Sequence, residues 1–176
     1  MALLKIARLG HPILRQTAEP VAVKSLQSEK LQSFIDDLVE TMIEEDGVGL
    51  AAPQVHSSTR IVVYRVAEPS LYAKSSEPRL HVLVNPVIAP LGQDTELDWE
   101  GCLSVPGLRG RVPRHTAVRV KALDRKGGKL DYVAKDFHAR VVQHECDHLD
   151  GIVYLDRMIE MTSLSFLEEL GRFSQE

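Results

Sequence analysis

Strand-like and helix-like segments do not alternate regularly along this chain. Residues 60–67 and 80–88 are rich in Val and Ile, which favour strands. Two further strand-like segments, 118–123 and 130–134, flank the turn sequence at 125–128 and predict a hairpin. Because a doubly wound sheet needs a helix after nearly every strand, the pattern favours an α+β fold with small mixed or antiparallel sheets.

Two stretches interrupt this pattern. Pro86 lies within the segment 80–88, and because proline cannot donate a ladder hydrogen bond, it predicts an edge strand or a bulge. Residues 68–79 contain two prolines, two adjacent serines and several charges, so we expect a loop there.

Three segments have helical features. Residues 25–46 place apolar side chains at spacings of three and four, which predicts an amphipathic helix that Gly47 ends in the left-handed conformation. Residues 136–150 predict a second helix with Gly151 as its end. A third, shorter helix is expected at about 162–173.

The composition is typical of one globular domain, which we expect to span residues 1–176. The 21 basic and 25 acidic residues give a net charge of −4, which disfavours a DNA-binding protein. The apolar runs are too short to cross a membrane, and the first residues lack the pattern of a signal peptide. Two cysteines are too few for a disulfide scaffold, so we expect a cytoplasmic protein. Because no apolar run is long enough to cross a membrane, we expect no membrane partner.

The second helix contains the motif H-E-x-x-H. His144 and His148 lie four residues apart, so they share a helix face and can bind one tetrahedral metal ion. Glu145 is next to the first histidine, where its carboxylate can hold a metal-bound water and move its proton. The alternative is a pair of surface histidines on an acidic helix. For the whole fold, we expect the small sheets to lie around a central, metal-binding H-E-x-x-H helix.

A catalytic metal of this kind needs a third protein ligand and an open position for water. Cys146 lies about 200° around the helix from His144, so we expect it to point away and to be buried as an apolar residue. Cys102 follows Gly101, which lets the backbone approach closely. The thiolate of Cys102 would complete a Cys/His/His site, and an inert core cysteine is the alternative.

Three motifs follow one another in the chain: Gly-Val-Gly-Leu-Ala-Ala-Pro-Gln at 47–54, Glu-Gly-Cys-Leu-Ser at 100–104 and Gln-His-Glu-Cys-Asp-His-Leu-Asp-Gly at 143–151. The first motif alone also fits a flexible loop after a helix. In this order the three resemble the signature motifs of peptide deformylases. Smaller matches at 10–15 and 112–114 extend the resemblance over nearly the whole chain, although the residues after Thr162 do not match the long C-terminal helix of the commonest bacterial form.

The resemblance implies a metal-dependent hydrolase that removes the N-formyl group from the N-terminal methionine of newly made proteins. It implies that Cys102, His144 and His148 bind the metal and that Glu145 is the general base and acid. The metal of this family is generally ferrous iron, for which zinc, nickel or cobalt can substitute. The implied partners are formylmethionyl nascent peptides and the ribosome near its exit tunnel, in a bacterial cytoplasm.

The resemblance also assigns substrate contacts. It implies that the side-chain amide of Gln54 and the backbone N–H of Leu103 polarise the formyl oxygen. The backbone at Val48, Gly49 and Gly101 is expected to hold the peptide like an added strand.

Helix spacing adds candidates for the methionine pocket. Phe137, Arg140 and Val141 lie seven, four and three residues before His144, on or beside the metal-facing side of the helix. We expect Val141 to line the pocket. Arg140 either pairs sideways with a surface carboxylate or places its guanidinium at the pocket rim, facing the peptide.

Two other functions stay open at this point. A zinc endopeptidase with H-E-x-x-H would recruit a downstream Glu or His as third ligand, and no histidine follows His148. A catalytically inactive, metal-stabilised binding protein would be suggested by the loss of Glu145 or Gln54, and both residues are present.

Overall fold

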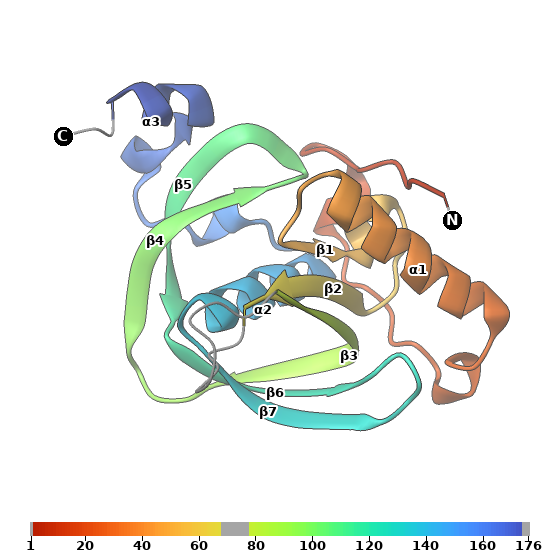
Figure 1. Cartoon of the computed structure of the whole chain (residues 1–176). Coiled ribbons are helices and arrows are strands. Elements are labelled where there is room, and N and C mark those ends of the chain that lie inside the picture. Colours follow the sequence, from red (N-terminus) through yellow and green to blue (C-terminus); the bar gives the residue numbers. More distant parts are fainter. Residues whose placement is uncertain (1, 68–77, 174–176) are drawn as a thin grey trace.

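Two antiparallel sheets form the framework of the computed structural model, which describes residues 2–67 and 78–173 (Figure 1). The larger sheet has the strand order β1-β2-β3-β6-β7 and the smaller sheet the order β4-β5-β8. The strands of the larger sheet are β1 (Gly49–Ala51), β2 (Ile61–Val66), β3 (Arg79–Pro90), β6 (Ala117–Leu123) and β7 (Lys129–Lys135). Those of the smaller sheet are β4 (Thr95–Cys102), β5 (Val105–His115) and β8 (Ser165–Phe166).

Three α-helices accompany the sheets: α1 (Glu29–Glu44), α2 (Asp136–Leu149) and α3 (Leu167–Phe173). Helix α2 lies at the centre of the molecule and contacts strands of both sheets (Figure 1). Short 3-10 turns occur at Pro12–Arg15, Val23–Ser25, Ala52–Val55, Tyr154–Arg157 and Met161–Ser163. The α+β prediction, with antiparallel sheets around a central H-E-x-x-H helix, is confirmed. None of the described helices combines the length and apolar character needed to cross a lipid bilayer.

Strand β2 shows how the two long helices cover the larger sheet. Its Val62 and Tyr64 belong to the apolar cluster that includes Val142 of α2. The alternate residues Ile61 and Val63 pack in a second cluster with Ile35, Leu38 and Met42 of α1. Since successive side chains of a strand point to opposite faces, α1 and α2 lie on opposite faces of this sheet. Coverage of both faces explains why β2 is almost continuously apolar.

The predicted strands and hairpin are confirmed by β2, β3, β6 and β7. Pro86 marks a bulge, because the β3–β6 register shifts between Val84 and Val87. It is not on an edge, since β3 lies between β2 and β6. Most of the expected loop at 68–79 lies outside the described residues, and its last residue, Arg79, begins β3.

Two helix predictions need correction. Helix α1 ends at Glu44, and the residue beyond it that takes the left-handed conformation is Asp46, with a φ of 52°, and not Gly47. The third helix begins at Leu167 and not near Thr162, because a 3-10 turn and strand β8 precede it. Strands β1, β4 and β5 were not predicted from the sequence, and all three border the site described next.

Candidate active site and metal centre

Helix α2 is almost entirely buried, with eleven of its fourteen residues shielded from solvent. Its final eleven residues include Arg140, Gln143, His144, Glu145, Asp147 and His148, which carry polar or charged groups. Burying such groups is costly unless each finds a partner. The interior position therefore rejects the alternative of two surface histidines, since His144 is 9% and His148 1% exposed.

Three potential metal donors meet at this helix. One ligand atom each from Cys102, His144 and His148 lies within 4.8 Å of the other two. Cys102 stands at the end of β4, where its Sγ is 3.2 Å from Nε2 of His148. Burial alone would raise the pKa of the Cys102 thiol, but the neighbouring His148 and His144 hold that pKa well below its usual value. A thiolate and two imidazoles form a donor set that fits a divalent transition metal.

Glu145 lies beside this donor set. Its side chain is buried, and Oε2 has no hydrogen-bond partner within residues 2–67 and 78–173. Burial raises the pKa of this carboxyl to about 7. A carboxylate without a fixed partner, one residue from a metal donor, is free to handle a proton in the site.

Gln54 is held in a fixed orientation next to Cys102. Its Oε1 accepts a hydrogen bond from the backbone N–H of Ala51 at 2.8 Å. Its Nε2 donates to Cys102 Sγ at 3.3 Å and to Ser104 Oγ at 3.2 Å. The short 3-10 turn at Ala52–Val55, which follows β1 directly, brings this buried amide to the centre. The side-chain amide of Gln54 is therefore fixed beside Cys102, one of the three potential metal donors.

A cavity of about 1110 Å³ opens onto these groups. The predicted residues that line it are Val48, Gly49, Gln54, Gly101, Cys102, Leu103, Val141, His144 and Glu145. Phe137 and Arg140 also line it. The structure thus brings together at one cavity every predicted site residue except His148. The Nε2 of His148 contacts Cys102 Sγ, but His148 does not line the cavity.

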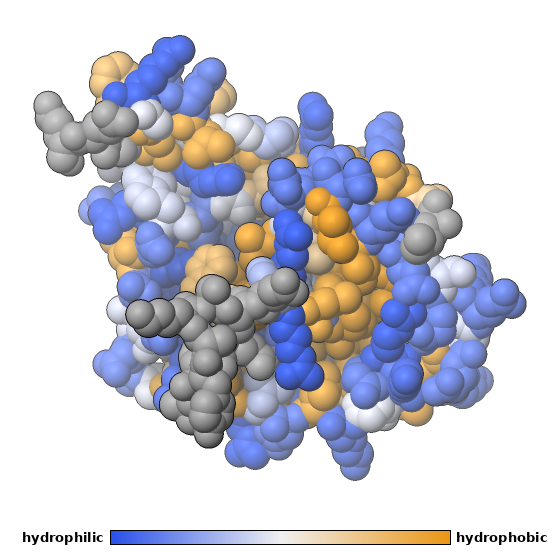
Figure 2. Space-filling view, viewed as in Figure 1, coloured by the Kyte–Doolittle hydropathy of each residue, from blue (hydrophilic) through white to orange (hydrophobic). Residues whose placement is uncertain are grey.

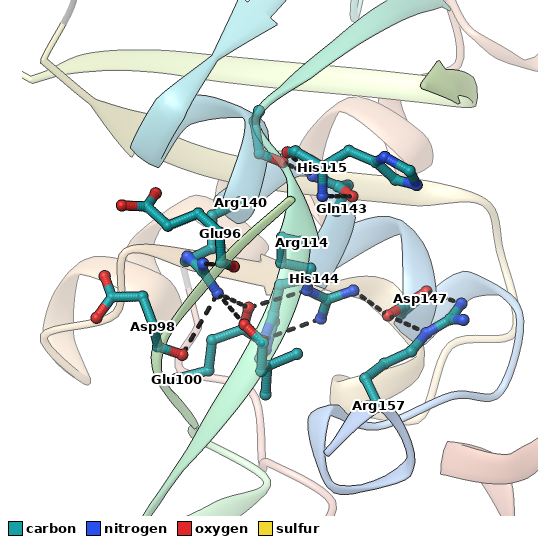
Figure 3. A network of polar contacts seen from close by, with 12 residues as sticks. Glu96, Asp98, Glu100, Arg114, His115, Arg140, Gln143, His144, Asp147 and Arg157 are labelled. Atoms are coloured by element: carbon teal, nitrogen blue, oxygen red, sulfur yellow. Dashed lines mark hydrogen bonds and ion pairs between the residues drawn. The ribbon is translucent and has the colours of Figure 1, made fainter. Parts of the chain in front are cut away.

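A buried ionic network supports the donor set from behind (Figure 3). Oε2 of Glu100 lies 2.9 Å from Nδ1 of His144, and both carboxylate oxygens accept hydrogen bonds from Arg114. Burial opposes ionisation of Glu100, but the bonds to His144 and Arg114 lower its pKa to about 2. Because Glu100 holds Nδ1, it turns Nε2 of His144 away from itself, toward the other donors.

The network continues along α2 through Asp147. This carboxylate accepts hydrogen bonds from Arg114 Nη1 and, at 2.8 and 3.1 Å, from Arg157 (Figure 3). Arg114 thus joins two buried carboxylates, one on β4 and one on α2. Glu100, Arg114 and Asp147 were not predicted as site residues, although each lies within or beside a motif.

Arg140 belongs to the same network, and neither expectation for it is correct. Its Nη1 lies 2.9 Å from Oε1 of Glu100 and 2.8 Å from the carbonyl oxygen of Val112, and its Nη2 donates to the carbonyl of Glu96 at 2.7 Å. The carboxylate that it meets is buried and not on the surface, and its guanidinium is not at the rim. Burial of a cation is tolerated here because these acceptors satisfy it.

Cys146 behaves as predicted. It is a free, buried cysteine in the apolar cluster between α2 and the larger sheet, with Val142 and Leu149. Burial raises the pKa of its thiol, so the group stays neutral. It does not belong to the metal-donor group, which contains only Cys102 of the two cysteines.

Residues 3–163 match the family model described as polypeptide deformylase. The chain belongs to the polypeptide deformylase family. Among relatives, "Peptide deformylase 1" of Nitrosomonas europaea is 40% identical, covering 94% of this chain and 93% of the relative. "Peptide deformylase 2" of Ralstonia nicotianae is 43% identical, covering 94% and 92%.

Solved deformylase structures agree with the fold. The Met-Ala-Ser-bound class I type b peptide deformylase of Acinetobacter baumannii has a TM-score of 0.81 at 40% identity, covering 89% of this chain and 99% of that one. The actinonin complex from Synechococcus elongatus has a TM-score of 0.78 at 34% identity, covering 97% and 86%. The deformylase family is metal-dependent, and these relatives give no support to an endopeptidase or to an inactive binding protein.

Proposed function

We propose that this deformylase removes the N-formyl group from the N-terminal methionine of newly made proteins, using a metal ion held by Cys102, His144 and His148. The observation that carries the proposal is the meeting of these three donors beside the unpartnered carboxylate of Glu145, at the wall of one cavity. The family and its relatives support the same reaction.

The donor chemistry supports a first-row divalent metal. We propose ferrous iron as the resident ion, with zinc, nickel or cobalt as substitutes, because a thiolate and two imidazoles suit all of these metals. Three protein ligands leave a position open for water or substrate. When bound, such an ion supplies Lewis acidity, which makes water a stronger nucleophile near neutral pH and polarises an amide carbonyl.

Glu145 is proposed to move the proton. Its free Oε2 can accept a proton from the attacking water and deliver it to the amine that leaves when the formyl C–N bond breaks. One carboxylate then serves as base and acid, and the products are formate and a free amino terminus. The Glu145 side chain is buried, so bulk water has little access to it.

Gln54 and Leu103 are proposed to stabilise the oxyanion that develops on the formyl oxygen. Gln54 Nε2 is held near Cys102 by the bond between its own Oε1 and Ala51, so little reorganisation is needed. Leu103 follows Cys102 directly and lines the same cavity, where its backbone N–H can contribute a second donor. One such donor is typically worth about 3 kcal/mol of barrier.

The peptide is proposed to bind between two sheet edges. Strand β1 ends the larger sheet and β4 begins the smaller one, and residues of both line the cavity. Extended peptides commonly add to such edges through main-chain hydrogen bonds. Val48 and Gly49 on one side and Gly101 on the other would hold the backbone, while Val141 lines the space for the methionine side chain.

We further propose that the protein acts in the bacterial cytoplasm, on nascent chains near the ribosomal exit tunnel. The support is that the relatives described above come from bacteria and that formylated peptides arise during translation. Cosedimentation with ribosomes that carry nascent chains, compared with empty ribosomes, tests the association.

The reaction is tested by measuring formate release from formyl-Met-Ala-Ser, beside a casein digest, with and without chelator. Chelator-sensitive formate release without casein cleavage is expected. Casein cleavage, or no formate release from metal-loaded protein, would contradict the proposal. Metal analysis of protein purified without oxygen identifies the resident ion.

A further inference from the structure

A large bulge in β5 forms one wall of the catalytic cavity. In the β4–β5 ladder, Glu100 pairs with Gly110 and Cys102 pairs with Val105. One residue on β4, Gly101, therefore faces four residues on β5, 106–109. Three of these four line the cavity: Pro106, Gly107 and Arg109. The bulge begins beside the metal donors and extends the cavity wall away from them.

The C-terminal segment, which comprises β8 and α3 (residues 165–173), continues this wall. Strand β8 pairs with the end of the bulge, with Phe166 opposite Leu108 and Ser165 opposite Arg109. The next residue, Leu167, begins α3 and lines the cavity although its side chain is 50% exposed. Apolar side chains gather on and next to α3, at the upper left of Figure 2.

This part of the wall lies beyond the end of the family model. The family model ends at residue 163, whereas Leu167 lies four residues further along. The cavity of about 1110 Å³ also exceeds the roughly 300–1,000 Å³ that encloses a drug-sized ligand, and one formylmethionine is smaller than that. The space next to Leu167 is therefore available for residues that follow the methionine.

We propose that Leu167 forms an apolar subsite for the second or third residue of the formylated peptide, so that the C-terminal segment sets a substrate preference of this enzyme. The inference rests on the proposed deformylase function and deepens it. Leu167 and Pro106 offer apolar contact in the cavity that Cys102 also lines, and the pairing of β8 with the bulge connects their segments. An aliphatic substrate side chain that covers Leu167 gains by leaving water.

The test compares kcat/KM for formate release from formyl-Met-Ala-Ser, formyl-Met-Leu-Ser and formyl-Met-Ala-Leu. The wild type is expected to prefer one of the two leucine peptides over formyl-Met-Ala-Ser. Leu167→Ala should reduce that preference roughly threefold to tenfold. Phe173→Ala is the matched control, because Phe173 is an exposed apolar residue of the same helix and does not line the cavity. It should keep the wild-type preference.

Leu167→Glu provides a second, independent measurement. It should shift the preference at the same substrate position from leucine to lysine, because a carboxylate attracts an ammonium group. Unchanged preferences in both Leu167 variants, or equal losses in Phe173→Ala, would overturn the subsite while leaving the deformylase proposal intact. Absence of formate release from every peptide by the wild type would overturn both.

Discussion

The carboxylate of Glu145 occupies the place that a side chain on Gly49 would need. A Cβ on Gly49 would stand 2.3 Å from Oε1 and 2.6 Å from Cδ of Glu145, which is closer than such atoms approach. Since Oε2 of Glu145 has no hydrogen-bond partner in the part of the chain that is described, contact with the bare backbone of Gly49 helps to position this carboxylate. Gly49 is therefore expected to position Glu145, the proposed proton carrier, as well as to contact the peptide backbone.

Gly49→Ala should displace the Glu145 carboxylate and lower turnover of formyl-Met-Ala-Ser by at least about tenfold, because a misplacement of 1 Å can cost about a hundredfold. Bound metal should stay stoichiometric, since Gly49 is not a donor. Turnover and metal content are measured on the same sample. Gly171→Ala is the control, because a Cβ there meets no atom within 4 Å. Wild-type turnover in Gly49→Ala would show that the carboxylate tolerates the added methyl group.

Glu145→Ala should retain metal and fold while losing at least about a hundredfold in turnover, the usual scale for a general acid–base group. Its resistance to denaturant should equal or exceed that of the wild type, because the substitution removes a buried, unpartnered carboxylate. Metal content, circular dichroism and denaturant melts accompany the kinetics. Loss of stoichiometric metal would instead make Glu145 a ligand.

The two cysteines provide a matched pair for the metal site. Cys102→Ser should weaken affinity for nickel or zinc by at least about a hundredfold. Loss of a residue that only hydrogen-bonds to a metal ligand costs up to about a hundredfold, and loss of a ligand should cost at least as much. Cys146→Ala should keep the wild-type affinity, because Cys146 packs in the apolar core. Equilibrium dialysis measures both. Full affinity in Cys102→Ser would place the third ligand elsewhere.

The iron form should lose activity in air faster than the nickel or cobalt forms. A thiolate ligand such as Cys102 is prone to oxidation when oxygen species reach it, and iron generates such species more readily. Residual activity and the oxidation state of Cys102, by mass spectrometry, are followed over time. Equal half-lives for the iron and nickel forms would argue against this route of inactivation.

Arg114→Met should destabilise the fold by about 3–5 kcal/mol, because it leaves the buried carboxylates of Glu100 and Asp147 without their shared cation. Arg119→Met is the control, since Arg119 pairs with Asp131 on the exposed surface and should change stability little. Urea melts of the two variants measure the difference. Equal, small losses would show that Arg140 and Arg157 compensate.

The sequence predicts best where the signal is local. The spacing of His144 and His148 on one helix face and the dense Val and Ile of β2 both lead to elements that the structure confirms. Strand β4 was missed because five of its eight residues are exposed, including Glu96 and Asp98, so its polar edge lacks a strand's usual apolar signal.

Other features depend on contacts between distant parts of the chain. Arg140 meets the carboxylate of Glu100 forty residues away, and no spacing within α2 reveals such a partner. Strand β8 forms through pairing with Leu108 and Arg109 of β5, so its sequence alone reads as part of a helix. The signal that could have found Glu100 is its position two residues before Cys102, a proposed metal ligand.

If the peptide binds between the sheet edges β1 and β4 at the cavity, as proposed, this arrangement also limits when the enzyme can work. A chain that lies between them must offer its own backbone N–H and C=O groups, so those groups cannot already be paired within a folded domain. An amino terminus that has entered a helix or sheet is therefore a poor substrate, whatever its sequence. The enzyme then competes with folding for each new protein, and the window for deformylation closes as the first residues of that protein become structured.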